Sequence, residues 1–191
     1  RRCGTTTCAE LPAGVPTGQS GPRLTAVTGL LMAYFRQSKR RTALALQTLF
    51  NVPCSAGLAV KQQDLVTEAL APCHAELAAV LPQATAASLD ETGTKEGPNK
   101  AWIWTAVTTT FTVFLVRLTR GADVARELLG ESFRGVITTD RYCGYHWHKK
   151  RQLCWAHLLR DFQGLIDRGG AGKRIGTRLR DVAWELFHHW H

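Results

Sequence analysis

Apolar and polar residues follow two different periods along the chain. From Leu24 to about Val80, apolar residues recur every three or four positions, which is the spacing of one face of an amphipathic helix. Ser38 can cap a helix, and the run Asn51-Val52-Pro53 can end one. We therefore expect three helices, over residues 24–34, 38–50 and 55–80, with the third interrupted near Pro72.

Short apolar runs replace this helical period from residue 84 onward. They predict strands over residues 84–89, 101–107, 112–118, 134–139 and 152–156. Short connections make the first three strands antiparallel, whereas a predicted helix over residues 122–129 separates the third from the fourth and indicates a crossover to parallel pairing. Two further helices are expected, over residues 157–166 and 173–191, with a break at Gly169–Gly172.

An aspartate follows each of two predicted strands. Asp90 closes the first strand and is expected to open a loop, and Asp140 closes the fourth. If these strands are neighbours, their carboxylates meet at one edge of the sheet and repel each other unless a cation lies between them. Oxygen ligands suit a hard divalent cation, which favours a metal site for phosphodiester chemistry. Two carboxylates that cap turns are the alternative.

Glu91 follows Asp90 directly. Adjacent residues of a strand point to opposite faces of the sheet, so Glu91 is not expected to share a metal with Asp90. We expect it to support the site indirectly or to lie on the surface.

Composition and charge indicate the kind of partner. The chain has 191 residues with 24 lysines and arginines against 15 aspartates and glutamates, which gives a net charge of +9 and favours a nucleic acid as partner. No apolar run is long enough to suggest a membrane span. Six cysteines without a disulfide pattern indicate reduced thiols. Cys3 and Cys8 supply two of the four ligands of a structural zinc site, so zinc is not expected.

Two basic clusters are candidate DNA contacts. They are Lys39, Arg40 and Arg41 in the first turn of the second helix, and Lys149, Lys150 and Arg151 after the fourth strand. The first cluster opposes its helix dipole and fits a helix-turn-helix-like binder or, equally, a solvated face. Tyr142, Tyr145 and Trp147 lie near the second cluster and could stack on unpaired bases, the alternative being that these aromatic residues belong to the core.

Five motifs occur in order along the second half of the chain. They are Leu89-Asp90-Glu91-Thr92, Ala101-Trp102-Ile103-Trp104, Ser132-Phe133-Arg134-Gly135-Val136, Thr139-Asp140-Arg141-Tyr142 and the ten residues from Leu153 to Phe162. Together they resemble the bacterial insertion-sequence transposases of the "insertion sequence sixty-six" family. The similarity extends upstream through Ala9–Pro16 and Gly21–Leu24, and so covers the chain from about Leu11 onward.

The resemblance implies a ribonuclease-H-like mixed sheet, with three antiparallel strands followed by parallel ones, preceded by a helix-turn-helix-like region. Residues 1–23 would be a linker and the tail of an incomplete zinc ribbon, and residues 24–82 the helical DNA-binding-like region. Residues 83–168 would form an incomplete catalytic core, and residues 169–191 the start of a helical insertion. Cys3 would match one ligand of the ribbon.

The resemblance also implies a mechanism. Family members use two aspartates and a glutamate to hold two magnesium (or manganese) ions, and Asp90 and Asp140 match the two aspartates. The glutamate stands beside paired asparagines in a motif that this chain does not contain, and Glu185 is not assigned its role. In related transposases a Cys/His pair follows the second aspartate, so His157, with Cys154, is an auxiliary candidate to orient the scissile phosphate or carry a proton. A packed cysteine and a backbone-bound histidine are the alternative.

The implied activity is metal-dependent DNA strand cleavage and strand transfer by a truncated transposase that is inactive on its own. The alternatives are a catalytically inactive DNA-binding remnant and a simple nuclease. The implied partners are DNA, further copies of the chain and accessory proteins of the element, in the bacterial cytoplasm and at the nucleoid.

Overall fold

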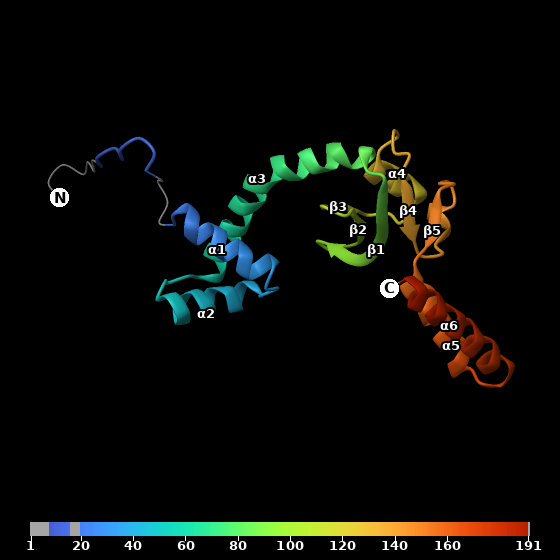
Figure 1. The fold of residues 1–191 in the computed structure, drawn as a ribbon. Helices are drawn as coiled ribbons and strands as arrows, with labels where there is room; N and C mark the ends of the chain where they lie inside the picture. The colour runs from blue at the N-terminus through green and yellow to red at the C-terminus, as the bar shows by residue number, and fades with distance from the viewer. Residues whose placement is uncertain (1–7, 16–19, 191) are drawn as a thin grey trace. The chain divides into compact units, whose positions relative to one another are not determined.

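The computed structural model describes residues 8–15 and 20–190, and Figure 1 shows the chain as a ribbon. These residues form two compact units, and the boundary between Cys73 and His74 lies within one long helix. Cys3 lies outside the described residues, and Cys8 is exposed. No helix of the described residues is long and apolar enough to cross a membrane.

The first unit consists of helices. They are α1 (Pro22–Ala33), α2 (Lys39–Phe50) and the first part of α3 (Ala56–Val80). The predicted cap of α2 is confirmed, because the hydroxyl of Ser38 accepts a hydrogen bond of 3.3 Å from the backbone N–H of Arg41. Asn51 ends α2 in a left-handed conformation, with φ of 52°.

α3 differs from its prediction. The expected interruption near Pro72 is wrong, because α3 runs without a break from Ala56 to Val80. A proline removes one backbone hydrogen bond of a helix, and it often bends the helix rather than ending it. A helix of this length can accept one missing bond.

The second unit is built on a five-stranded mixed sheet. Its strands are β1 (Ala86–Glu96), β2 (Asn99–Val107), β3 (Thr112–Arg117), β4 (Val136–Thr139) and β5 (Arg151–Leu153), in the order β3-β2-β1-β4-β5. β1, β2 and β3 pair antiparallel, whereas β4 pairs parallel with β1 and with β5. The predicted succession of antiparallel and then parallel strands is thus confirmed, and the first and fourth strands are neighbours.

β1 continues beyond its predicted end. Asp90 does not open a loop but lies inside β1, where it pairs with Thr105 of β2. The strand extends to Glu96 because a turn at Gly97, with φ of 59°, returns the chain into β2. β5 is shorter than predicted, since Cys154 already caps the next helix.

α4 (Ala122–Leu129) packs against β2 and β3 and completes the core of the second unit. The core includes Leu89, Trp104, Leu129 and Ile137, together with Tyr145 from a short helical turn, η2 (Cys143–Tyr145). Another such turn, η1 (Leu81–Gln83), links α3 to β1. Alternate strand residues such as Val107, Phe114 and Val116 remain exposed, so one face of the sheet is largely open.

α5 (Trp155–Asp167) and α6 (Gly170–Trp190) form a helical hairpin at the end of the chain. They lie side by side in Figure 1, and the turn between them uses Gly169 and Gly170 at positive φ. The predicted break at Gly169–Gly172 is therefore limited to Gly169 and Gly170, and α6 already begins at Gly170. The expected apolar stripe of α6 remains exposed. The contacts of α6 with α5 include close approaches at Gly172 and Gly176 and an edge contact between Phe187 and Trp155 of α5.

Candidate functional site

Parallel pairing of β1 with β4 brings the two predicted aspartates to the same level of the sheet. Ala86 pairs with Val136, and Ser88 pairs with Thr138. The same offset, continued by two residues, places Asp140 opposite Asp90. Paired strands lie about 5 Å apart, so the backbones of the two aspartates are neighbours at this point. Asp90 is exposed and Asp140 is half-buried.

Each of these carboxylates accepts one backbone hydrogen bond. Oδ1 of Asp90 accepts from the N–H of Glu91 at 3.0 Å, and Oδ1 of Asp140 accepts from the N–H of Tyr142 at 2.8 Å. Such bonds fix the direction of each carboxylate. The second oxygen of each side chain remains free to bind a cation or water.

His157 lies close to both aspartates. A cavity of about 210 Å³ is lined by Asp90, Thr105, Cys154 and His157. A second cavity, of about 300 Å³, is lined by Asp140, Arg160 and again His157. His157 lies in the first turn of α5, and its side chain lines both cavities. Its Nδ1 is buried without a hydrogen-bond partner among the described residues, so the alternative of a side chain held by the backbone is not what the structure shows.

Glu91 occupies the opposite face of β1, as expected, but it is not a surface residue. Its side chain is 1% exposed and forms an ion pair with Arg120, whose Nε lies 2.8 Å from Oε1 of Glu91. The hydroxyl of Tyr145 donates to the other oxygen, Oε2. A buried carboxylate needs such partners, because water no longer solvates its charge.

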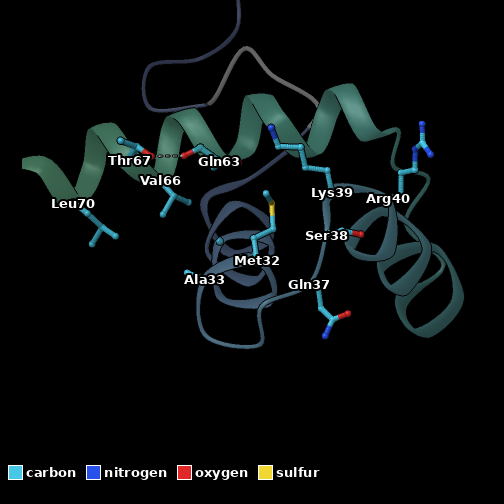
Figure 2. Close-up of a pocket in the computed structure, with 11 residues that line it drawn as sticks. Met32, Ala33, Gln37, Ser38, Lys39, Arg40, Gln63, Val66, Thr67 and Leu70 are labelled. Carbon is cyan, nitrogen blue, oxygen red and sulfur yellow. Dashed lines mark hydrogen bonds between the residues drawn. The ribbon is translucent and has the colours of Figure 1, made fainter. Parts of the chain in front are cut away.

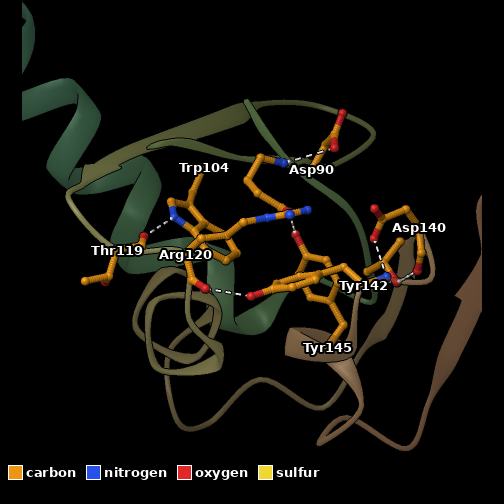
Figure 3. Close-up of polar contacts among 9 residues, drawn as sticks. Asp90, Trp104, Thr119, Arg120, Asp140, Tyr142 and Tyr145 are labelled. Carbon is orange, nitrogen blue, oxygen red and sulfur yellow. Dashed lines mark hydrogen bonds and ion pairs between the residues drawn. The ribbon is translucent and has the colours of Figure 1, made fainter. Parts of the chain in front are cut away.

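Aromatic side chains enclose the guanidinium of Arg120. It lies 4.0 Å from the ring centre of Tyr142 and 4.9 Å from that of Trp102. The hydroxyl of Tyr142 also donates to the backbone carbonyl of Arg120 at 2.6 Å. Since the N–H of Tyr142 binds Asp140, and that of Glu91 binds Asp90, this cluster touches both aspartates through the backbone (Figure 3).

The electrostatics of the cluster favour a charged Arg120 and a neutral Tyr145. Burial lowers the pKa of Arg120, but the hydrogen bond and charge of Glu91 outweigh it, so that the pKa stands above its ordinary value. Burial raises the pKa of Tyr145 far above its ordinary value, and Glu91 and the charges of Asp140 and Asp90 act in the same direction. Tyr145 therefore remains a hydrogen-bond donor at any physiological pH.

The basic cluster of the first unit is exposed. Lys39, Arg40 and Arg41 form the first turn of α2, and all three side chains are exposed to solvent. Lys39 and Arg40 also line a largely apolar cavity of about 840 Å³, shown in Figure 2, together with Val66 and other residues of α1 and α3. Both predicted interpretations, contact with a polyanion and a solvated helix face, require this exposure.

The basic cluster of the second unit is only partly available. Lys149 and Lys150 are exposed, and Nζ of Lys150 donates to the carbonyl of Arg134 at 3.1 Å. Arg151 is half-buried as the first residue of β5. The idea that neighbouring aromatic residues stack on bases fails for Tyr145, which is fully buried in the core. Tyr142 and Trp147 are half-buried and pack against the same core.

Sequence reasoning missed Arg120 and Tyr145 as supports of the site. Arg120 stands in a polar turn and Tyr145 in a basic, aromatic-rich segment, and neither belongs to a recognisable periodic pattern. The one available signal was Glu91, an acid on the core-facing side of a strand, which requires a buried cation or donor nearby.

The carboxylates of Asp90 and Asp140 fit a divalent cation in part. Asp90 and Asp140 offer free oxygens at adjacent strands, which suits a hard cation. Among the described residues, however, no group of three or more histidines, cysteines, aspartates and glutamates is close enough to form a complete metal site. The two aspartates thus fit part of a metal site, with further ligands required from water, substrate or another carboxylate.

The second unit is therefore a mixed α/β fold in which Asp90 lies within β1 and Asp140 directly follows the neighbouring strand β4. A comparison with protein families matches residues 18–188 to the family described as Transposase IS66 family. Because this match spans most of the chain, the chain belongs to the IS66 family of transposases, as its motifs predicted. A comparison with curated proteins found no match.

Proposed function

We propose that the chain acts in DNA transposition, as a DDE-type transposase domain that cleaves and joins DNA strands at Asp90 and Asp140. The observation that supports this proposal is the parallel register of β1 and β4, whose offset, if continued two residues beyond the pair Ser88 and Thr138, would bring Asp140 opposite Asp90. The order β3-β2-β1-β4-β5 supports a ribonuclease-H-like fold. The family of the chain supports DNA as the substrate.

Asp90 and Asp140 would hold magnesium or manganese through their free oxygens. Two such ions, when bound, stabilise the charge on the attacking and leaving oxygens of a phosphodiester displacement. The displacement begins as a hydroxyl oxygen, from water or from a DNA 3′ end, forms a bond to phosphorus. The bond from phosphorus to the departing 3′ oxygen breaks at the same time, so that the backbone is either hydrolysed or joined to a new strand.

His157 and the basic residues would position the DNA. The position of His157 between the two cavities suits a contact with the scissile phosphate, for which a protonated imidazole is a donor. Exposed basic side chains that can neutralise phosphates are those of Lys39, Arg40, Arg41, Lys149 and Lys150. The half-buried Arg151 contributes less to such a surface.

The test is nicking of supercoiled plasmid DNA by the full 191-residue chain in magnesium or manganese. Any nicking should be lost in Asp90→Ala and in Asp140→Ala and be retained in Asp64→Ala, which removes an exposed aspartate from α3. Binding of manganese, measured by calorimetry, should weaken in the same two variants. Nicking that persists in both Asp90→Ala and Asp140→Ala would refute the assignment of the site.

A catalytically inactive DNA-binding protein of this family is the second candidate. It is favoured because no three histidines, cysteines, aspartates or glutamates of the described residues are grouped closely enough to hold a metal ion. DNA binding without nicking, at every metal concentration, would select this alternative. In that case a charge reversal in the cluster Lys39, Arg40 and Arg41 should weaken binding and reduce its salt dependence.

A further inference from the structure

One side of α6 carries an apolar stripe that no described residue covers. Ile175, Leu179, Val182 and Leu186 are 52%, 39%, 58% and 42% exposed. Their spacing of four, three and four residues keeps them on one side of the helix over about three turns. This is the spacing through which helices pack against other helices.

α5 contacts a neighbouring side of α6 and leaves the stripe open. A Cβ on Gly176 would lie 2.5 Å from the carbonyl oxygen of Phe162, and one on Gly172 would lie 2.8 Å from that of Leu165, so the two helices are in close backbone contact there. None of the residues of α5, all of which the structure describes, is fully buried. Two helices alone thus leave much apolar surface exposed, and a helical bundle would require further helices.

The charges beside the stripe are segregated along α6. Arg174 and Arg178 lie in its first half, and Asp181 and Glu185 lie in its second half; all four line a shallow groove of about 570 Å³ beside Val182. This order opposes the helix dipole, which favours acids near the N-terminus and bases near the C-terminus. The same order is complementary to an identical helix that runs in the opposite direction.

The central charges of this pattern lack partners within the described chain. Neither Arg178 nor Glu185 forms an ion pair with another described residue. Asp181 has a longer contact, of 3.8 Å, with Arg180. An opposite charge from outside the subunit can therefore reach Arg178 and Glu185 without displacing an existing pair.

We propose that α6 pairs in antiparallel fashion with α6 of a second copy of this chain. The contact is two-fold symmetric, so that each apolar contact and each ion pair occurs twice in the dimer. Leu179 packs against Val182 of the partner subunit, and Ile175 packs against Leu186 of the partner subunit. Arg178 then lies beside Glu185 of the partner subunit. The two α5–α6 hairpins together form a four-helix bundle.

The length of the stripe indicates a weak, reversible dimer. From Ile175 to Leu186 the helix rises by roughly 16 Å, at about 1.5 Å per residue. This contact is shorter than those of permanent dimers, which bury far larger surfaces. Monomer and dimer should therefore exchange, with a dissociation constant in the micromolar range.

Sedimentation of the full chain over a range of micromolar concentrations tests the proposal. We expect Val182→Glu to raise the dissociation constant at least tenfold, because two carboxylates would enter the apolar seam. Trp184→Glu is the matched control, since Trp184 is 57% exposed but lies on the opposite side of α6, two residues further on. This variant should dimerise like the unmodified chain. Circular dichroism should show unchanged helix content in both.

A charge exchange tests the antiparallel direction. Arg178→Glu places like charges opposite each other twice in the dimer and should weaken it severalfold. Adding Glu185→Arg to the same chain restores opposite charges and should recover the original dissociation constant. The pair of changes leaves the net charge of the chain unaltered, so recovery cannot arise from net charge.

Two results would overturn the proposal. One is a chain that remains monomeric throughout the concentration range, and the other is a dimer that withstands Val182→Glu. The proposal does not rest on the chemistry at Asp90 and Asp140, because a chain that dimerises through α6 without nicking DNA would uphold it.

Discussion

Glu91 provides the sharpest test of how the second unit is held together. The variant Glu91→Gln keeps the shape of the side chain but removes its charge. In the unmodified chain this carboxylate binds Nε and Nη2 of Arg120, at 2.8 Å and 2.5 Å, and accepts the hydroxyl of Tyr145. The amide can accept only one or two of these bonds, and it places two N–H donors near the remaining ones.

The expected loss of folding stability in Glu91→Gln depends on how deeply Glu91 and Arg120 are buried. Removing one partner of a fully buried ion pair costs about 3–5 kcal/mol, because the other charge is left without solvent. Arg120 is 36% exposed, so water can partly replace Glu91 as its partner. The expected loss is therefore smaller, about 2–3 kcal/mol, which is close to the value of about 1.5–3 kcal/mol for a hydrogen bond to a charged group.

Tryptophan fluorescence during denaturant unfolding measures this loss within the second unit. All six tryptophans lie there, from Trp102 onward, so the signal does not report on the helical first unit. The matched control is Glu127→Gln. It removes the same charge from an ion pair with Arg117 in which both side chains are more than 40% exposed, and the expected loss is below about 1 kcal/mol. A loss for Glu91→Gln no larger than that of the control would refute the reasoning.

The remaining predictions concern one titration and the close approaches of glycines. Because folding raises the pKa of Tyr145, the folded chain keeps the phenol proton at pH values where the unfolded chain releases it. The free energy of unfolding should therefore fall by about 1.4 kcal/mol per pH unit above pH 10. Tyr145→Phe should remove this part of the pH dependence in alkaline unfolding curves. Gly176→Ala should lower the melting temperature, because its Cβ would meet the backbone of α5, whereas Gly164→Ala adds a methyl group in open space within α5 and should stabilise the helix by up to about 1 kcal/mol. Gly135→Ala should destabilise the β1–β4 contact, since its Cβ would lie 2.5 Å from the carbonyl oxygen of Ala84, and equal melting temperatures for this variant and the unmodified chain would contradict the described packing.

Periodicity was sufficient to predict most elements of the fold. The succession of strands and the place of α4 along the chain followed from short apolar runs and their connections, whereas the neighbourhood of the first and fourth strands was implied by the family resemblance. Strand ends were less predictable. Residues 91–96 are mostly polar, yet they belong to β1, because the turn at Gly97 gives them a partner strand. Local polarity cannot reveal a pairing that depends on a turn further along.

The site was predictable where it follows from strand order and unpredictable where it depends on packing. From the residues alone, the approach of Asp90 and Asp140 was predicted only if their strands were neighbours, and the parallel pairing of β1 with β4 meets that condition. Arg120 reaches Glu91 across 29 positions of sequence, and Tyr145 reaches it across 54. Such contacts arise from the folding of loops over the sheet, for which the sequence contains no periodic signal. Likewise, the apolar stripe of α6 was visible in the sequence, but which side of the helix α5 covers was not.

The two aspartates differ in how firmly the backbone holds them. Asp90 lies in the interior of β1, with paired residues before and after it, whereas Asp140 follows the last residue of the four-residue strand β4. In hydrogen-exchange terms, the amides around Asp90 should open only with the sheet as a whole, and those from Asp140 to Tyr142 should open by local fraying at a lower free energy. Under the proposed function, a backbone rearrangement on phosphate binding is therefore expected at Asp140 rather than at Asp90.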